Sequence, residues 1–173
     1  MSKNTDCWLP DIEPCEDFAK YDEYIEQIYS IFKNDFIVSS VVFNGAIVEI
    51  DRTIGSTGKE KGFEHVVTND FEKNQKRYPD FQRSERIRWI KAFIENYNCR
   101  QDWNCNDDMC DGIKVWEKRQ GKHIRIKFLF EEESFIVIIE RTKNWYFLVT
   151  AYYIDYEHTM DKLIEEYRES KTK

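Results

Sequence analysis

Three parts of the chain repeat apolar residues every three or four positions, the spacing of an amphipathic helix. They are residues 16–34, 83–97 and 159–171. In the first of them, the apolar positions are Phe18, Tyr21, Ile25, Ile28 and Phe32. Asp17 and Ser84 stand where the N-caps of the first two helices are expected. The pattern therefore predicts three helices, one of which ends the chain.

Six other stretches are rich in β-branched residues or alternate apolar with polar side chains, as strands do. Residues 36–43 and 46–52 flank Asn44-Gly45, a pair that favours a two-residue hairpin turn. The other four stretches are 113–119, 123–130, 135–141 and 145–154. Because only a few residues separate these four, they must pair as antiparallel neighbours. The sequence thus predicts a hairpin and, later, a four-stranded antiparallel meander.

The order of these elements predicts an α+β fold in a single domain, 1–173. An N-terminal helix and hairpin occupy 1–59, a core occupies 60–156, and a C-terminal helix occupies 157–173. We expect helix 83–97 to pack on one face of the meander.

Composition narrows the class of protein. No apolar run reaches the length of a membrane span, and the N-terminal residues lack the apolar stretch of a signal peptide. We therefore expect a cytoplasmic protein without membrane contact. Without a secretion signal, its five cysteines are expected to be reduced thiols. Cys99, Cys105 and Cys110 lack the close cysteine pair of structural zinc sites, so no metal and no cofactor is expected.

Charge is distributed unevenly along the chain. The net charge is −7, and residues 1–35 hold nine Asp/Glu against three Lys. Residues 73–91 hold seven Lys/Arg against two acids, and residues 114–127 hold six against one. The two basic windows fit either a solvated cationic face or a local phosphate-binding surface on an acidic protein.

Candidate chemistry centres on His65, one of three histidines. Several arginines follow it, and Thr150 and Tyr152 lie two positions apart on the last predicted strand, so they share a face. Cleavage of RNA without a metal needs a base for the ribose 2′-hydroxyl, a cation for the phosphate and a donor at the leaving oxygen. Histidine and arginine suit the first two roles. The alternative is that His65 is a packed structural residue.

Three short segments resemble the barnase–EndoU–colicin–RelE superfamily of small RNA-cleaving toxins, most closely its phage-associated branch. These segments are "GFEHVV", "RSERIRWIKAFIEN" and "FLVTAYYI", within 60–156. The resemblance implies that His65 is the general base or acid and that Arg86 or Arg88 holds the phosphate, with Arg88 favoured. It also implies that Thr150 and Tyr152 complete the pocket. The further cations expected to contact RNA are Arg83, Arg86, Lys91 and Arg125.

The function expected from the resemblance is a metal-independent endoribonuclease, similar to a toxin or phage-defence effector, that leaves a 2′,3′-cyclic phosphate. Its partners would be RNA, whether tRNA, mRNA or ribosome-bound RNA, and a cognate antitoxin or immunity protein. One alternative is a non-catalytic acidic protein of the immunity or antitoxin kind, since a negative surface can block a basic nuclease. Another is an accessory nucleic-acid-binding protein.

Overall fold

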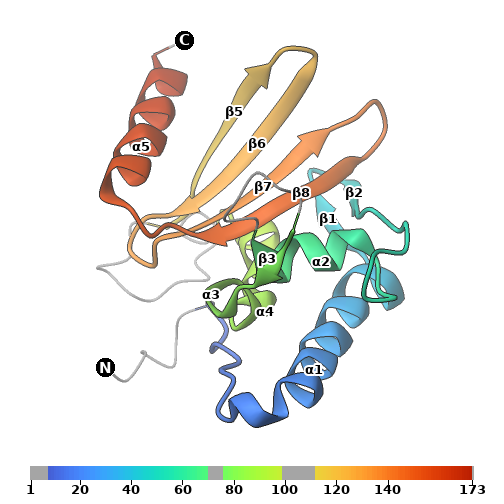
Figure 1. Cartoon of the computed structure of the whole chain (residues 1–173). Helices are drawn as coiled ribbons and strands as arrows, with labels where there is room; N and C mark the ends of the chain where they lie inside the picture. Colours follow the sequence, from blue (N-terminus) through green and yellow to red (C-terminus); the bar gives the residue numbers. More distant parts are fainter. Residues whose placement is uncertain (1–7, 70–75, 99–111, 173) are drawn as a thin grey trace.

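The structure is a computed structural model, and it describes residues 8–69, 76–98 and 112–172. It is α+β, as the sequence predicts. One six-stranded sheet has the strand order β1-β2-β8-β7-β6-β5, and helices lie on both of its faces (Figure 1). A separate pair, β3 (Thr68–Asn69) and β4 (Tyr78–Pro79), lies beside it. Within the described ranges, no helix is both long and apolar enough to cross a membrane.

The predicted meander is confirmed, and its strands agree with the expected bounds to within one residue at each end. It consists of β5 (Lys114–Gln120), β6 (His123–Phe130), β7 (Phe135–Arg141) and β8 (Tyr146–Tyr153). All three pairings between neighbours are antiparallel. A bulge between Ile138 and Ile139 shifts the register of β7 against β8. Short turns therefore fixed this part of the topology, as the spacing indicated.

The predicted hairpin is also present, as β1 (Val41–Phe43) and β2 (Ala46–Glu49). Both turn residues, Asn44 and Gly45, have positive φ angles of 48° and 78°, the geometry of a type I′ turn. The sequence did not indicate where this hairpin attaches. Strand β2 pairs in parallel with β8 and so extends the meander to six strands.

The predicted strand 36–43 is wrong in its first half. Helix α1 (Tyr21–Lys33) continues into a π-helical turn, Asn34–Val38, and β1 starts only at residue 41. Phe36 is buried against Phe32, with ring centroids 4.9 Å apart, which keeps the chain helical past the expected end. Tertiary packing has overridden the β-propensity of this segment.

The predicted helix 83–97 is present in two parts, α3 (Phe81–Ser84) and α4 (Ile87–Glu95). Asp80, rather than Ser84, is the N-cap of α3, because its carboxylate accepts a hydrogen bond from the Arg83 backbone N–H at 3.1 Å. Ser84 is buried and donates to the Asp80 carbonyl. The backbone of Arg86, with φ −100° and ψ 19°, separates the two helices.

Two apolar clusters lie on the two faces of the sheet. The larger contains residues of α1 and α4, and the rings of Trp89 and Phe93 contact Phe135 of β7 edge-on at 5.5 and 5.6 Å. Tyr24 of α1 is buried. Phe18, which was expected on the core face, lies in the 3₁₀ turn Phe18–Lys20 before α1 and is 70% exposed. The smaller cluster lies under α5 (Glu157–Lys171), beside β5 at one edge of the sheet (Figure 1).

Candidate active site

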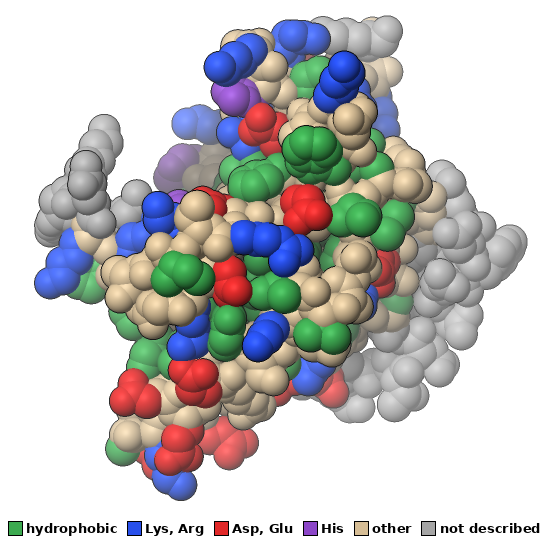
Figure 2. Space-filling model, turned by 90° about the vertical axis from the view of Figure 1, so that its right-hand side faces the viewer, with side chains coloured by type: hydrophobic (Ala, Val, Ile, Leu, Met, Phe, Trp, Pro, Cys, Tyr) green, Lys and Arg blue, Asp and Glu red, His purple; other side chains and the backbone are tan. Residues whose placement is uncertain are grey.

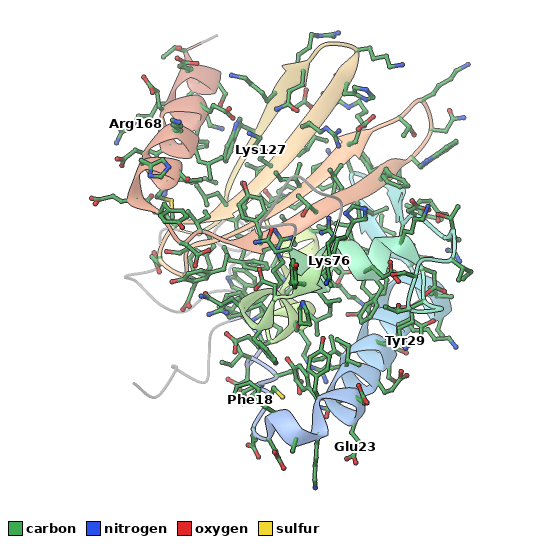
Figure 3. The ribbon with its side chains drawn as sticks, viewed as in Figure 1. Phe18, Glu23, Tyr29, Lys76, Lys127 and Arg168 are labelled. Atoms are coloured by element: carbon green, nitrogen blue, oxygen red, sulfur yellow. The ribbon has the colours of Figure 1, made fainter. Side chains whose placement is uncertain are left out.

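A surface pocket of about 760 Å³ surrounds His65. Three segments form it: the loop after β2, helix α2 (Lys61–Val67) and the residues just before β4. Its lining residues are Gly55, Ser56, Thr57, Lys61, Glu64, His65, Thr68, Lys76 and Arg77. In Figure 3, Lys76 is seen beside α2. The pocket therefore joins segments on both sides of the histidine in the sequence.

Helix α2 carries His65 on its exposed face, because Phe63, Val66 and Val67 are buried in the core on the other side. The helix starts close to the chain that leaves β2. Gly62 donates its N–H to the Asp51 carbonyl at 3.0 Å. A Cβ atom at Gly62 would lie 3.0–3.2 Å from Ile50 and the Asp51 backbone, so a larger residue would push α2 away from β2. Close packing thus fixes the position from which His65 faces solvent.

Glu64 fastens the loop over the pocket. Its carboxylate accepts hydrogen bonds from the Thr57 backbone N–H at 2.7 Å and from the Thr57 hydroxyl at 2.6 Å. A Cβ atom at Gly55 would overlap this carboxylate, so a larger residue would force Glu64 to move away from Thr57. Burial tends to raise the pKa of Glu64, but the hydrogen bonds from Thr57 and the charge of His65 outweigh it and lower the pKa. Glu64 is therefore a fixed anion beside the histidine.

Asp51 places a second carboxylate near His65. Hydrogen bonds from Thr53, at 2.9 Å from the backbone N–H, lower the pKa of Asp51, and the charges of Lys61 and His65 add to this effect. Asp51 and Glu64 are thus two carboxylates whose charges interact with His65.

Three cations, Lys61, Lys76 and Arg77, line the pocket around His65. The Arg77 guanidinium is fixed by Thr68, because Nε donates to the hydroxyl at 2.7 Å and Nη2 to the carbonyl at 2.9 Å. The pairing of β3 with β4 places Arg77 here, since Thr68 lies opposite Pro79 in that ladder. Glu64, the pocket's acid, is bound to the loop. The pocket therefore suits an anionic ligand such as a phosphate.

Arg83 connects the histidine segment to strand β8. Its Nη1 donates to the His65 carbonyl at 3.1 Å and to the Thr150 hydroxyl at 3.5 Å. Its Nε lies 3.3 Å from the Asp80 carboxylate, and its guanidinium carbon lies 5.5 Å from the centre of the Tyr152 ring. One arginine thus joins three of the residues expected at the site.

Thr150 and Tyr152 lie on the same face of β8, where they pair with Ile138 and Ile136. Neither residue lines the His65 pocket. Burial raises the pKa of the Tyr152 hydroxyl, and the charge of Arg83 opposes this effect only in part. Tyr152 is therefore a neutral hydrogen-bonding group at neutral pH.

Arg88 and Arg86, the arginines expected to hold the phosphate, do not line the pocket. Arg88 forms an ion pair with Glu13, on the side of α4 that faces the N-terminal segment. The Arg86 guanidinium carbon lies 5.1 Å from the Trp89 ring centre and 4.8 Å from that of Tyr153. Arg83, in α3, is the arginine of this region that contacts the histidine segment.

The two other cations expected to contact RNA also lie outside the pocket. Lys91 lies 3.7 Å from Asp35 of the π-helical turn. Arg125, on β6, forms an ion pair with Glu140 at 2.9 Å, and His123 contacts the same carboxylate at 2.6 Å. Both cations are thus engaged in bonds within the fold.

Sequence reasoning missed Lys61, Glu64, Lys76 and Arg77. Lys76 and Arg77 belong to the basic window 73–91, which was a usable signal, but only the β3–β4 pairing shows that they return to His65. The prediction about Cys99, Cys105 and Cys110 lies outside the described residues. Among the residues that the structure does describe, no group of three or more His, Cys, Asp or Glu could hold a metal ion.

Comparisons of the chain with protein-family models, with curated protein sequences and with solved structures found no match. Any statement about function therefore depends on the geometry of the site.

Proposed function

We propose that this protein is a metal-independent endoribonuclease of the kind found among toxins and phage-defence effectors. One observation carries the proposal: His65 is exposed in a pocket that it shares with Lys61, Lys76 and Arg77. A proton acceptor beside three phosphate-binding cations is what cleavage by the ribose 2′-hydroxyl needs. A purely structural histidine would not need this surrounding charge.

In the proposed reaction, His65 removes the 2′-hydroxyl proton, and the 2′-oxygen attacks the adjacent phosphorus. Arg77 and Lys61 stabilise the additional negative charge of the five-coordinate phosphorus. The bond from phosphorus to the 5′-oxygen then breaks, and that oxygen takes a proton from the exposed Lys76 ammonium or from water. The products are a 2′,3′-cyclic phosphate and a 5′-hydroxyl, and the proton on His65 returns to solvent.

Arg83 acts as a positioning residue in this scheme. It contacts the backbone of His65 and the side chains of Thr150 and Tyr152. Its guanidinium also forms an ion pair with Asp80. It therefore fixes the end of α2 against β8. Arg83 acts through His65, whereas the phosphate role expected for Arg88 falls to Arg77 and Lys61. Thr150 and Tyr152 support Arg83 in turn.

The proposal is tested by incubating purified protein with total RNA in the presence of EDTA and analysing the fragment ends. We expect fragments with 2′,3′-cyclic phosphate and 5′-hydroxyl ends, unaffected by EDTA. Abolition of cleavage by EDTA, or fragments with 5′-phosphate ends, would contradict the proposed chemistry. RNA that stays intact under all conditions would contradict the proposed function itself.

A second candidate function is a non-catalytic acidic binding protein of the immunity or antitoxin kind. The observation in its favour is the group of Asp and Glu side chains where α1 begins, at the lower end of the molecule in Figure 2. Such a surface can cover the basic cleft of a nuclease. The exposure of His65 among cations favours the first candidate, and intact RNA in the assay above would favour the second.

A further inference from the structure

A groove of about 680 Å³ lies where the β1–β2 hairpin meets the turn between β7 and β8. Its lining residues are Gly45, Ala46, Ile47, Glu49, Ile50, Asn144, Trp145 and Phe147. Ile47 and Trp145 are each 45% exposed, although both are large and apolar. An indole and a phenyl ring at an open groove offer flat faces for stacking.

Basic turns lie at the same end of the sheet as this groove. The β5–β6 and β7–β8 turn regions, residues 117–125 and 140–147, hold six Lys/Arg against two Glu. In Figure 1 both turns project from the same side of the sheet. Figure 2 faces the β1–β2 edge and shows Lys and Arg side chains bordering hydrophobic ones at its upper end. The acidic side chains at the start of α1 lie at the opposite end of this view.

Both glutamates of these turn regions are already paired. Glu117 forms an ion pair with Arg141, and Glu140 is shared by His123 and Arg125. Arg119, Lys122 and Lys143 are exposed, and no described residue forms an ion pair with any of the three. Their charges are therefore available to a ligand.

We propose that this groove, together with the cations Arg119, Lys122 and Lys143 at the same end of the sheet, binds single-stranded RNA. Bases stack on Trp145, and backbone phosphates contact the cations, the combination that binds single strands without a metal. The inference rests on the proposed ribonuclease function for its choice of ligand. Single-stranded RNA is favoured over a duplex because a duplex keeps the faces of its bases stacked on one another.

The groove adjoins the His65 pocket along the chain. Glu49 and Ile50 line the groove at the end of β2, and Gly55 and Ser56, a few residues later, line the pocket. Under this proposal, an RNA strand would run from the groove along the loop after β2 into the pocket. The groove would then hold nucleotides several positions away from the cleaved bond, which makes long single strands the preferred substrates.

The test measures fluorescence anisotropy of a labelled, unstructured 20-nucleotide RNA with full-length protein that carries His65→Ala. Trp145→Ala should weaken binding about ten-fold, the order expected for the loss of one stacked base. Trp145→Phe should restore most of that affinity, because the phenyl ring also stacks. The triple change Arg119→Gln, Lys122→Gln and Lys143→Gln should lower the slope of log affinity against log salt by about 2.

The matched control replaces three exposed cations outside these turns, Lys20, Lys162 and Arg168, with Gln. It makes the same change in net charge, and Figure 3 shows Arg168 on α5, at the other side of the sheet. We expect this control to leave both affinity and salt slope close to those of the His65→Ala parent. Equal losses in the control and the groove variant would overturn the proposal, since net charge alone would then explain the binding.

Cleavage is measured separately, in proteins that retain His65. The groove variants should cut the 20-nucleotide RNA about ten-fold less efficiently and should cut a dinucleotide at the unchanged rate. If no variant cuts either RNA, the proposed ribonuclease function fails. The anisotropy data would still show whether the groove binds single-stranded RNA. Unchanged anisotropy in Trp145→Ala would overturn the groove assignment, as would a wild-type dimer in sedimentation that Trp145→Ala dissociates.

Discussion

At the level of single residues, a few hydrogen bonds and close contacts position the loop and the helix around His65. Glu64 holds the pocket loop through Thr57, and Gly55 is the residue whose missing side chain makes space for that carboxylate. Arg83 reaches from α3 to the His65 carbonyl. These residues fix the geometry around His65 without themselves supplying its chemistry.

The Glu64 contact predicts a dependence of stability on pH. Because the folded protein lowers the pKa of Glu64 below its ordinary value of 4.5, the ionised carboxylate stabilises the fold. This contribution is present above pH 4.5 and is lost as the pH falls through the lower, folded-state pKa. Thr57→Val removes one hydrogen bond to the carboxylate and should reduce the dependence. Urea unfolding between pH 3 and 7 measures it, and parallel profiles for both proteins would contradict the assignment.

Gly55→Ala should destabilise the protein and weaken the pocket at once. The new methyl group would overlap the Glu64 carboxylate, so the loop or the glutamate must move. We expect a loss of about 1–3 kcal/mol in the free energy of unfolding, typical of overpacking. The control is the same change in a Glu64→Ala background, where the carboxylate that the methyl group would overlap is absent. Urea unfolding curves give the loss caused by Gly55→Ala in each background, and equal losses would count against the overlap.

Arg83→Lys tests the positioning role. Lysine keeps the positive charge but cannot contact Asp80, Thr150 and the His65 carbonyl together. We expect kcat on RNA to fall by up to about 100-fold, the order of loss when a reacting group is misplaced by about 1 Å. The same experiments measure the KM and the pH at which kcat is half-maximal for the Arg83→Lys variant. Unchanged kcat in a protein of unchanged stability would remove Arg83 from the account.

At the scale of elements, local pattern predicted the fold well, and contacts distant in sequence explain what it missed. The four strands of the meander follow from alternation and short turns. The parallel pairing of β2 with β8 could not be inferred, because the local sequence pattern of a strand does not specify which distant strand it pairs with. Likewise, the resemblance favoured Arg88, but contacts distant in sequence pair Arg88 with Glu13 and place Arg83 against His65 and Thr150.

A buried charge joins helix α5 to the sheet, in addition to the apolar cluster beneath the helix. Lys127 of β6 is 6% exposed and donates to Glu166 of α5 at 2.7 Å, and the Trp116 indole donates to the same carboxylate at 3.2 Å. Figure 3 shows Lys127 on the part of β6 that lies toward α5. Burial tends to raise the pKa of Glu166, but Lys127 and Trp116 outweigh it and lower the pKa.

This arrangement predicts that Glu166→Gln costs more stability than Lys127→Met. The first change leaves a buried ammonium without its counter-ion, at a cost of about 3 kcal/mol, whereas the second removes the buried charge altogether. Glu165→Gln, at an exposed position next in sequence, is the control and should have little effect. The free energies of unfolding in urea decide the order, and equal losses from the first two variants would contradict it.

The molecule as a whole is acidic, yet one of its pockets combines an exposed histidine with three cations. The direct measurement is the rate of cleavage of single-stranded RNA by His65→Ala, with His158→Ala as the control, since His158 is exposed on α5. We predict that His65→Ala lowers the rate by on the order of 10²–10⁴, with an unchanged melting temperature, because one proton acceptor is lost. His158→Ala should cleave at the wild-type rate. Undiminished cleavage by His65→Ala would contradict the central claim.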